Sequence, residues 1–89
     1  MAAAPKNPGI ADTLGWILVQ NGETERGLAL LRQANLTTPS AGMRYHLAAA
    51  LSKSGKREEA LRVVTELLAS GTPFDDLAAA QELKAKLGG

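Results

Sequence analysis

The chain repeats itself at an offset of 33 residues, and this internal repeat limits the possible folds more than any other feature. Gly22 and Gly55 are equivalent under this offset, and each separates two apolar stretches with helical spacing. The other aligned pairs are Leu14 with Leu47, Gly15 with Ala48, Leu18 with Leu51, Glu25 with Glu58, Gly27 with Ala60, Leu28 with Leu61 and Leu31 with Val64. A repeat of this length predicts stacked helix-turn-helix units.

The apolar spacing and the turn residues predict five helices. We expect them at about 9–20, 24–36, 41–54, 57–69 and 73–87. Ser40 is the expected N-cap of the third helix, and Thr72 that of the fifth, with Pro73 in its first helical position. Thr37-Thr38-Pro39 is expected to end the second helix. The predicted organisation is a disordered lead at 1–8, a first repeat at about 8–40, a second at about 41–73 and a capping helix at about 73–87.

The same spacing predicts which side chains are buried. The expected inward residues are Ile10, Leu14, Ile17 and Leu18, then Leu28, Leu31 and Ala34, then Met43, Leu47, Ala50 and Leu51, then Ala60, Leu61, Val64, Leu67 and Leu68, and finally Phe74, Leu77, Leu83 and Leu87. Gly27 is unusual, because glycine inside a helix costs roughly 1 kcal/mol relative to alanine. Its presence predicts that two helix backbones approach closely there.

Composition supports an all-α fold and narrows the classes of partner. Ala and Leu dominate the apolar residues, and there is one each of Phe, Tyr and Trp, which favours helices over strands. Ten basic and nine acidic residues give a net charge of +1, so nothing attracts nucleic acid over a long range. The longest apolar run, 14–19, is far shorter than the roughly 20 residues of a membrane span. We therefore predict neither nucleic-acid binding nor membrane insertion.

The sequence lacks the groups that catalysis requires. His46 is the only imidazole and there is no cysteine, whereas a metal site normally needs three or four ligands. We therefore predict no catalytic residue, no metal and no cofactor, which disfavours a small enzyme. Lys53, Lys56 and Arg57 form a small basic group that we expect to be solvated.

The repeat unit resembles the tetratricopeptide family, whose pattern is Trp-x2-Leu-Gly-x2-Tyr, then Ala-x3-Phe, then Pro. Leu14 and Gly15 match the Leu-Gly pair, Leu18 replaces Tyr, Gly27 replaces Ala, Leu31 replaces Phe, Pro39 closes the unit, and Ala11 stands in place of the leading Trp. Residues 8–73 resemble two consecutive repeats. The resemblance implies a right-handed α-solenoid whose concave groove holds a protein or peptide.

In that family the first helix of each repeat lines the groove. The resemblance thus implies partner-binding residues at Asp12, Trp16, Val19, Gln20, Tyr45, His46, Ala49 and Lys53, continued by Asp75, Ala79 and Glu82 on the last helix. An exposed Trp16 would be an anchor for a partner. The alternative is that Trp16 packs flat against Tyr45. The groove lacks the Lys, Asn and Arg set that clamps chaperone carboxylates, which disfavours that function.

A narrower resemblance comes from three short segments. Asp-Thr-Leu-Gly-Trp, Arg-Tyr-His-Leu-Ala and Thr-Pro-Phe resemble the C-terminal end of long bacterial tetratricopeptide proteins. These include envelope lipoproteins linked to exopolysaccharide export and PEP-CTERM protein sorting. This resemblance implies a periplasmic or envelope-associated location, and without it the location would be cytoplasmic.

Two interpretations of function remain beside the disfavoured enzyme. The first is a protein-interaction scaffold that binds a peptide or protein segment in the groove and is a fragment of a longer protein. The second is a structural cap of a longer repeat array, because Ile10 and Ile17 would be partly uncovered without a preceding repeat. The uncovered first helix also predicts weak self-association.

Overall fold

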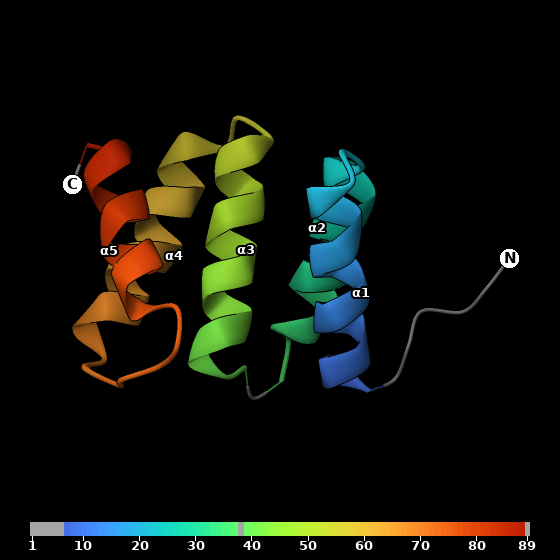
Figure 1. Ribbon diagram of the computed structural model, residues 1–89, viewed down its shortest axis with the longest axis horizontal. Helices are drawn as coiled ribbons and strands as arrows, with labels where there is room; N and C mark the ends of the chain where they lie inside the picture. The colour runs from blue at the N-terminus through green and yellow to red at the C-terminus, as the bar shows by residue number, and fades with distance from the viewer. Residues whose placement is uncertain (1–6, 38, 89) are drawn as a thin grey trace, which may run out of the picture.

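The computed structural model describes residues 7–37 and 39–88. Within these ranges the regular secondary structure is entirely helical. The helices are α1 (Pro8–Gln20), α2 (Thr24–Ala34), α3 (Ala41–Lys53), α4 (Arg57–Ala69) and α5 (Leu77–Lys86). They stand side by side in chain order, so the molecule is elongated, with extents of 39 × 25 × 18 Å (Figure 1). The predicted all-α, five-helix repeat fold is confirmed.

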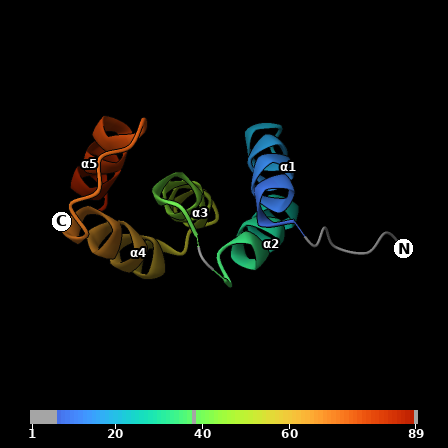
Figure 2. The same cartoon turned by 90° about the horizontal axis from the view of Figure 1, so that it is seen from below.

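Each repeat is a helical hairpin, and the hairpins stack. α1 packs against α2 and α3 against α4, while α2 contacts α3 and α4 contacts α5. Viewed along the helices, α2 and α4 lie on one side of an arc, and α1, α3 and α5 lie on the other (Figure 2). The inner side of the arc is therefore made by the first helix of each repeat and by the last helix.

The first helix begins one residue earlier than the sequence predicts. The Asn7 side chain accepts hydrogen bonds from the backbone N–H groups of Gly9 (2.8 Å) and Ile10 (3.3 Å), and Pro8 occupies the first helical turn. An asparagine cap followed by proline is a strong helix start. The end of the expected disordered lead is thus the start of α1, and residues 1–6 lie outside the described part of the chain.

Gly22 and Gly55 end α1 and α3 as predicted. Their φ angles are +89° and +84°, in the left-handed region that only glycine enters at little cost. Both hairpins therefore have the same kind of turn at the same place in the repeat.

The close approach predicted at Gly27 is a contact with a second glycine. A Cβ atom added at Gly27 would lie 2.5 Å from the Gly15 carbonyl oxygen and 2.9 Å from the Val19 backbone nitrogen. A Cβ added at Gly15 would lie 2.8 Å from the Gly27 carbonyl oxygen. Because backbone atoms are among those that obstruct each added Cβ, side-chain rotation alone cannot relieve these clashes. Glycine is therefore required at both positions for α1 and α2 to pack this closely.

This contact explains why the predicted inward face of α1 is wrong. Ile10, Leu14 and Ile17 are 57%, 43% and 50% exposed. The side that faces α2 instead carries residues that are buried: Ala11, Gly15 and Val19. The helix has two apolar stripes, and close packing of backbones selects the stripe with small side chains. Hydrophobicity alone favours the stripe with large ones.

The inward residues of the other helices largely match the prediction. Leu28, Leu31, Ala34, Leu47, Ala50, Leu51, Ala60, Val64, Leu67 and Leu87 are buried, and Met43, Leu61, Leu68, Phe74, Leu77 and Leu83 are partly buried. Most of these side chains form one core that runs through both hairpins and reaches α5. The core is therefore continuous across the repeat boundary.

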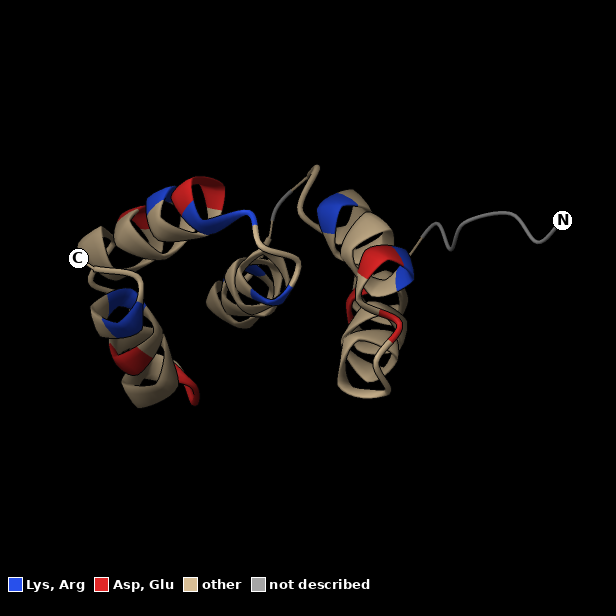
Figure 3. Ribbon diagram, turned by 90° about the horizontal axis from the view of Figure 1, so that it is seen from above, with Lys and Arg blue, Asp and Glu red and all other residues tan. Residues whose placement is uncertain are grey.

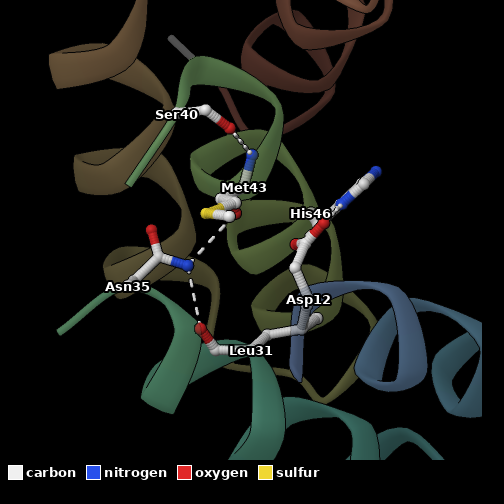
Figure 4. A network of polar contacts seen from close by, with 6 residues as sticks. All are labelled: Asp12, Leu31, Asn35, Ser40, Met43 and His46. Atoms are coloured by element: carbon white, nitrogen blue, oxygen red, sulfur yellow. Dashed lines mark hydrogen bonds and ion pairs between the residues drawn. The ribbon is translucent and has the colours of Figure 1, made fainter. Parts of the chain in front are cut away.

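The second helix is shorter than predicted. It ends at Ala34, and the Asn35 side-chain amide donates hydrogen bonds to the carbonyl oxygens of Leu31 (2.8 Å) and Met43 (3.2 Å) (Figure 4). An asparagine that binds backbone carbonyls competes with continued helix. This amide ends α2 and ties it to α3. Thr38 belongs to the segment Thr37-Thr38-Pro39 that is expected to end this helix, and it lies outside the described residues.

The third helix starts as predicted, because the Ser40 hydroxyl accepts a hydrogen bond from the Met43 backbone N–H at 3.2 Å (Figure 4). The fifth helix does not start where the sequence predicts, because it begins at Leu77 rather than at Pro73. The Thr72 hydroxyl lies 3.5 Å from the Ser70 hydroxyl and so interacts with the preceding turn. Phe74 packs against the core from the irregular segment that results.

Polar contacts join helices that are distant in sequence. The Arg57 guanidinium donates two hydrogen bonds to the Leu87 carbonyl oxygen, at 2.9 and 3.2 Å, and so caps the end of α5. This corrects the expectation that Arg57 is only solvated. Arg32 on α2 forms a two-pronged ion pair with Glu59 on α4, at 2.6 and 3.0 Å. The hydrogen bond from Arg32 lowers the pKa of Glu59, and Glu59 raises the pKa of Arg32.

Substitution of Gly27→Ala should lower the free energy of unfolding by about 1–3 kcal/mol, because the new methyl group meets backbone. Urea unfolding followed by circular dichroism measures this change. Gly42→Ala is the matched control, since a Cβ there would have its nearest neighbour at 3.9 Å. The control should keep or gain stability, by up to about 1 kcal/mol. Equal effects of the two substitutions would contradict the glycine contact.

Substitution of Glu59→Gln should lower stability at pH 7 by about 0.2–1 kcal/mol, a small amount because both partners are partly exposed. Since the pKa of Glu59 is lowered in the folded chain, its contribution is full above the ordinary carboxyl pKa. It disappears as the pH falls through the lowered value. Unfolding curves of wild type and variant should therefore converge in acid. Glu66→Gln on the same helix is the control and should show no such pH-dependent difference.

Candidate partner-binding surface

The inner side of the arc brings four of the predicted site residues together. Asp12 and Trp16 are one helical turn apart on α1, so their side chains share a face. That face is turned toward α3, where Tyr45 and His46 lie. The contacts between the two helices make this group a single cluster, which we call the inner cluster: Asp12, Trp16, Tyr45 and His46.

Trp16 stacks on a different partner from the one considered in the sequence. Its ring centroid lies 4.2 Å from that of His46, with the planes 18° apart. Tyr45 is more distant, at 6.0 Å and 59°. Trp16 therefore packs flat against His46 rather than Tyr45, and this contact contributes to holding α1 beside α3.

A hydrogen bond between His46 and Asp12 reinforces the stack. His46 Nδ1 lies 2.9 and 3.1 Å from the two carboxylate oxygens of Asp12. Because an ionised carboxylate only accepts hydrogen bonds, Nδ1 carries the proton in this contact. The other ring nitrogen points away from Asp12 (Figure 4). The two side chains are only 13% and 18% exposed, so solvent screens their interaction weakly.

Tyr45 extends the cluster toward α5. Burial raises the pKa of its hydroxyl, and the negative charges of Asp76 and Glu82 raise it further. Both carboxylates thus act on Tyr45 from the last helix and its cap. The aromatic group is therefore flanked by acidic charge on the α5 side, and Tyr45 itself is partly exposed.

The other predicted site residues differ in how much of each side chain is exposed to solvent. Gln20 and Lys53 are exposed at the ends of α1 and α3. Val19 is 1% exposed and Ala49 9% exposed, so neither side chain offers much area to a partner. Val19 belongs to the stripe that packs on α2, which is why it leaves the candidate surface. On the last helix, Glu82 is exposed and Ala79 partly buried, and Asp75 is exposed just before it.

Hollows lie elsewhere on the surface, and one of them is on the first helix, which the sequence predicts to be partly uncovered. One of about 470 Å³ lies on the free side of α1, lined by Asn7, Gly9, Ile10, Thr13, Leu14 and Ile17. Another, of about 430 Å³, lies between the start of α3 and the end of α4, beside Arg44 and Thr72. Neither includes a member of the inner cluster.

Metal sites and membrane-spanning helices were also sought among the described residues. Over 7–37 and 39–88, no three of the His, Cys, Asp and Glu side chains are placed to hold a metal ion. Within the same ranges, none of the helices has the length and apolar character needed to cross a bilayer.

Two stacked helical hairpins followed by a further helix define a tetratricopeptide-like repeat protein. The family described as "Anaphase-promoting complex, cyclosome, subunit 3" matches residues 1–67, about three quarters of the 89-residue chain. The chain belongs to this family of helical repeats. No curated protein and no solved structure matches it. The family supports a protein-interaction scaffold in general terms and is generally non-enzymatic.

Substitution of His46→Ala should expose one face of the Trp16 ring and remove the partner of Asp12. We expect a shift of tryptophan emission to longer wavelength and a loss of about 1–3 kcal/mol in stability. Trp16 is the only tryptophan, so emission reports on this contact alone. Gln81→Ala, at an exposed position of α5, is the control. An unchanged emission spectrum in the His46 variant would contradict the stack.

Proposed function

We propose that this chain is a protein-interaction module that holds an extended segment of a partner along the inner sides of α1, α3 and α5. The observation that carries the proposal is the inner cluster: three ring side chains from two repeats meet on one side of the arc. Aromatic side chains in a rigid setting are the usual energetic centres of protein interfaces. The cluster lies where a partner would contact both repeats at once.

The contacts suggest separate roles for its members. Asp12, Trp16 and His46 bind one another, so their arrangement is fixed before a partner arrives, which reduces the entropy lost on binding. Tyr45 is the side chain of the cluster that is free to contact a partner through its ring and hydroxyl. Gln20 and Lys53 are exposed beside it and would supply polar contacts at the rim.

Peptides selected from a displayed random library against the chain test this proposal. Tyr45→Ala should weaken the selected peptides at least about tenfold, which corresponds to about 1.4 kcal/mol. Isothermal titration calorimetry measures the affinities, and nuclear magnetic resonance should show shifts at Trp16, Tyr45 and His46. Thr65→Ala, at an exposed site on α4, is the matched control and should change nothing.

The opposite result would reject the inner side as the binding surface. Peptides that are insensitive to Tyr45→Ala, or that shift only resonances of α4, would place the contact on the outer side of the arc. His46→Ala distinguishes the packing of the cluster from the direct contact of Tyr45 with the peptide, because it loosens the cluster without removing Tyr45. A smaller loss of affinity than in the Tyr45 variant is expected.

A second candidate function is a structural cap of a longer repeat array. The observation that favours it is the exposure of Ile10 and Ile17, which a preceding repeat would cover. Under this function the chain has no binding site of its own, and no peptide selected against it would depend on Tyr45.

We also propose, on the narrower resemblance alone, that the partner belongs to a bacterial envelope system of the exopolysaccharide or protein-sorting type. The segments Asp-Thr-Leu-Gly-Trp and Arg-Tyr-His-Leu-Ala support it. An upstream lipoprotein signal with further repeats in the same gene would strengthen this assignment, and a cytoplasmic gene neighbourhood would reject it.

A further inference from the structure

A hollow of about 430 Å³ lies at the open end of the second hairpin, between the start of α3 and the end of α4, at the lower edge of the molecule in Figure 1. We call it the hairpin-base hollow, and its lining includes Pro39, Ser40, Ala41, Arg44, Leu67 and Thr72. Its volume is in the range of small-molecule sites. None of these residues belongs to the inner cluster, so the hollow is separate from the proposed peptide contact.

Arg44 is the charged side chain of this lining, and it has no partner. The side chain is partly buried. Within 7–37 and 39–88 it forms neither an ion pair nor a hydrogen bond. A guanidinium carries five N–H donors, and removing a charge from water without a partner is unfavourable. The described chain therefore leaves a set of donors unused at this hollow.

The first repeat shows that the fold does not need arginine at this position. At the offset of 33 residues, Arg44 corresponds to Ala11 and Leu67 corresponds to Ala34. Both alanines are fully buried, so small side chains occupy these positions in the first hairpin. In the second hairpin a long cationic side chain takes the place of one of them, beside a hollow. Packing of the repeat does not account for Arg44.

No carboxylate of the described residues lines the hairpin-base hollow. The segments that form it, 39–44 and 67–72, contain neither Asp nor Glu. In Figure 3 the ribbon of α3 accordingly shows blue but no red. Glu66 lines a neighbouring hollow of about 270 Å³ that Arg44 also lines, but it forms no ion pair with Arg44. The hairpin-base hollow is therefore positively charged and suited to an anion.

We propose that the hairpin-base hollow binds a phosphoryl group carried on a small apolar body. The hydroxyl groups of Ser40 and Thr72 line it together with Arg44. The Ser40 hydroxyl accepts a hydrogen bond from the Met43 backbone N–H, and the Thr72 hydroxyl accepts one from Ser70, so each keeps its own proton for a ligand. Three donor groups suit the three oxygens of a phosphoryl group. The two oxygens of a carboxylate are satisfied by the guanidinium alone.

The apolar part of the lining sets the rest of the ligand. Pro39 and Ala41 lie at the start of α3, and Leu67 lies opposite them near the end of α4. A ring or short aliphatic group attached to the phosphate would cover this surface, and removing apolar surface from water favours binding. An aryl phosphate should therefore bind more tightly than inorganic phosphate.

Nuclear magnetic resonance titrations of the full chain at constant ionic strength test the proposal. Phenyl phosphate should shift the backbone amides of 40–44 and 70–72 with a dissociation constant of about 0.1–5 mM. Inorganic phosphate should bind more weakly, and benzoate about tenfold more weakly than phenyl phosphate. Arg44→Ala should weaken phenyl phosphate by about tenfold or more. Arg62→Ala, at an exposed site of α4 outside the lining, is the matched control and should leave the affinity unchanged.

The Arg44 variant should remain folded, because the first repeat has alanine at the equivalent position, and circular dichroism checks this. Equal weakening by the two substitutions would mean that phosphate responds only to the total charge, and would reject the site. Benzoate that binds as tightly as phenyl phosphate would reject the phosphoryl group as the ligand. Inorganic phosphate that binds as tightly as phenyl phosphate would overturn the apolar body, and no saturable shift with any of the three probes would overturn the whole proposal.

Discussion

The contact between Gly15 and Gly27 determines how the rest of the first repeat is arranged. It allows α1 and α2 to approach until backbone meets backbone, and this fixes the rotation of α1 about its own axis. With that rotation fixed, Ala11 and Val19 are buried, and Asp12 is directed toward α3. The inner cluster and the exposure of Ile10, Leu14 and Ile17 both follow from one close crossing of two helices.

The second repeat carries a slightly larger residue at each of these positions. The positions equivalent to the two glycines hold Ala48 and Ala60, and both are fully buried. The second hairpin therefore buries a methyl group at each position where the first hairpin has glycine. The constraint that recurs at 33 residues is thus a small side chain on each helix at the crossing point, and the large hydrophobic residues fill the space around it.

Much of the fold follows from local patterns in the sequence. The two hairpins, the Gly22 and Gly55 turns and the core of α2 to α4 could be predicted, because each depends on helical spacing or on a turn residue. The buried face of α1 could not, since two apolar stripes compete and only the Gly15–Gly27 contact decides between them. The start of α5 depends on Phe74 reaching the core, which is a tertiary effect.

The side of the fold on which Trp16, Tyr45 and His46 lie could be predicted, but the contacts among them could not. The repeat pattern places Trp16, Tyr45 and His46 on the inner side of a solenoid, because the position of a residue within the repeat determines the side on which it lies. It does not say that His46 lies between Trp16 and Asp12, since that depends on the distance and rotation between α1 and α3. Val19 was misassigned for the same reason as Ile10 and Leu14: all three depend on how α1 is rotated.

The three sides of α1 have different chemical character, and this difference bears on how the chain could use them together. The side on α2 is small and buried, the side toward α3 is polar and aromatic, and the free side is aliphatic. Because α1 contacts both α2 and α3, two of its sides are occupied by neighbouring helices, and the third, which carries Ile10, Leu14 and Ile17, is exposed.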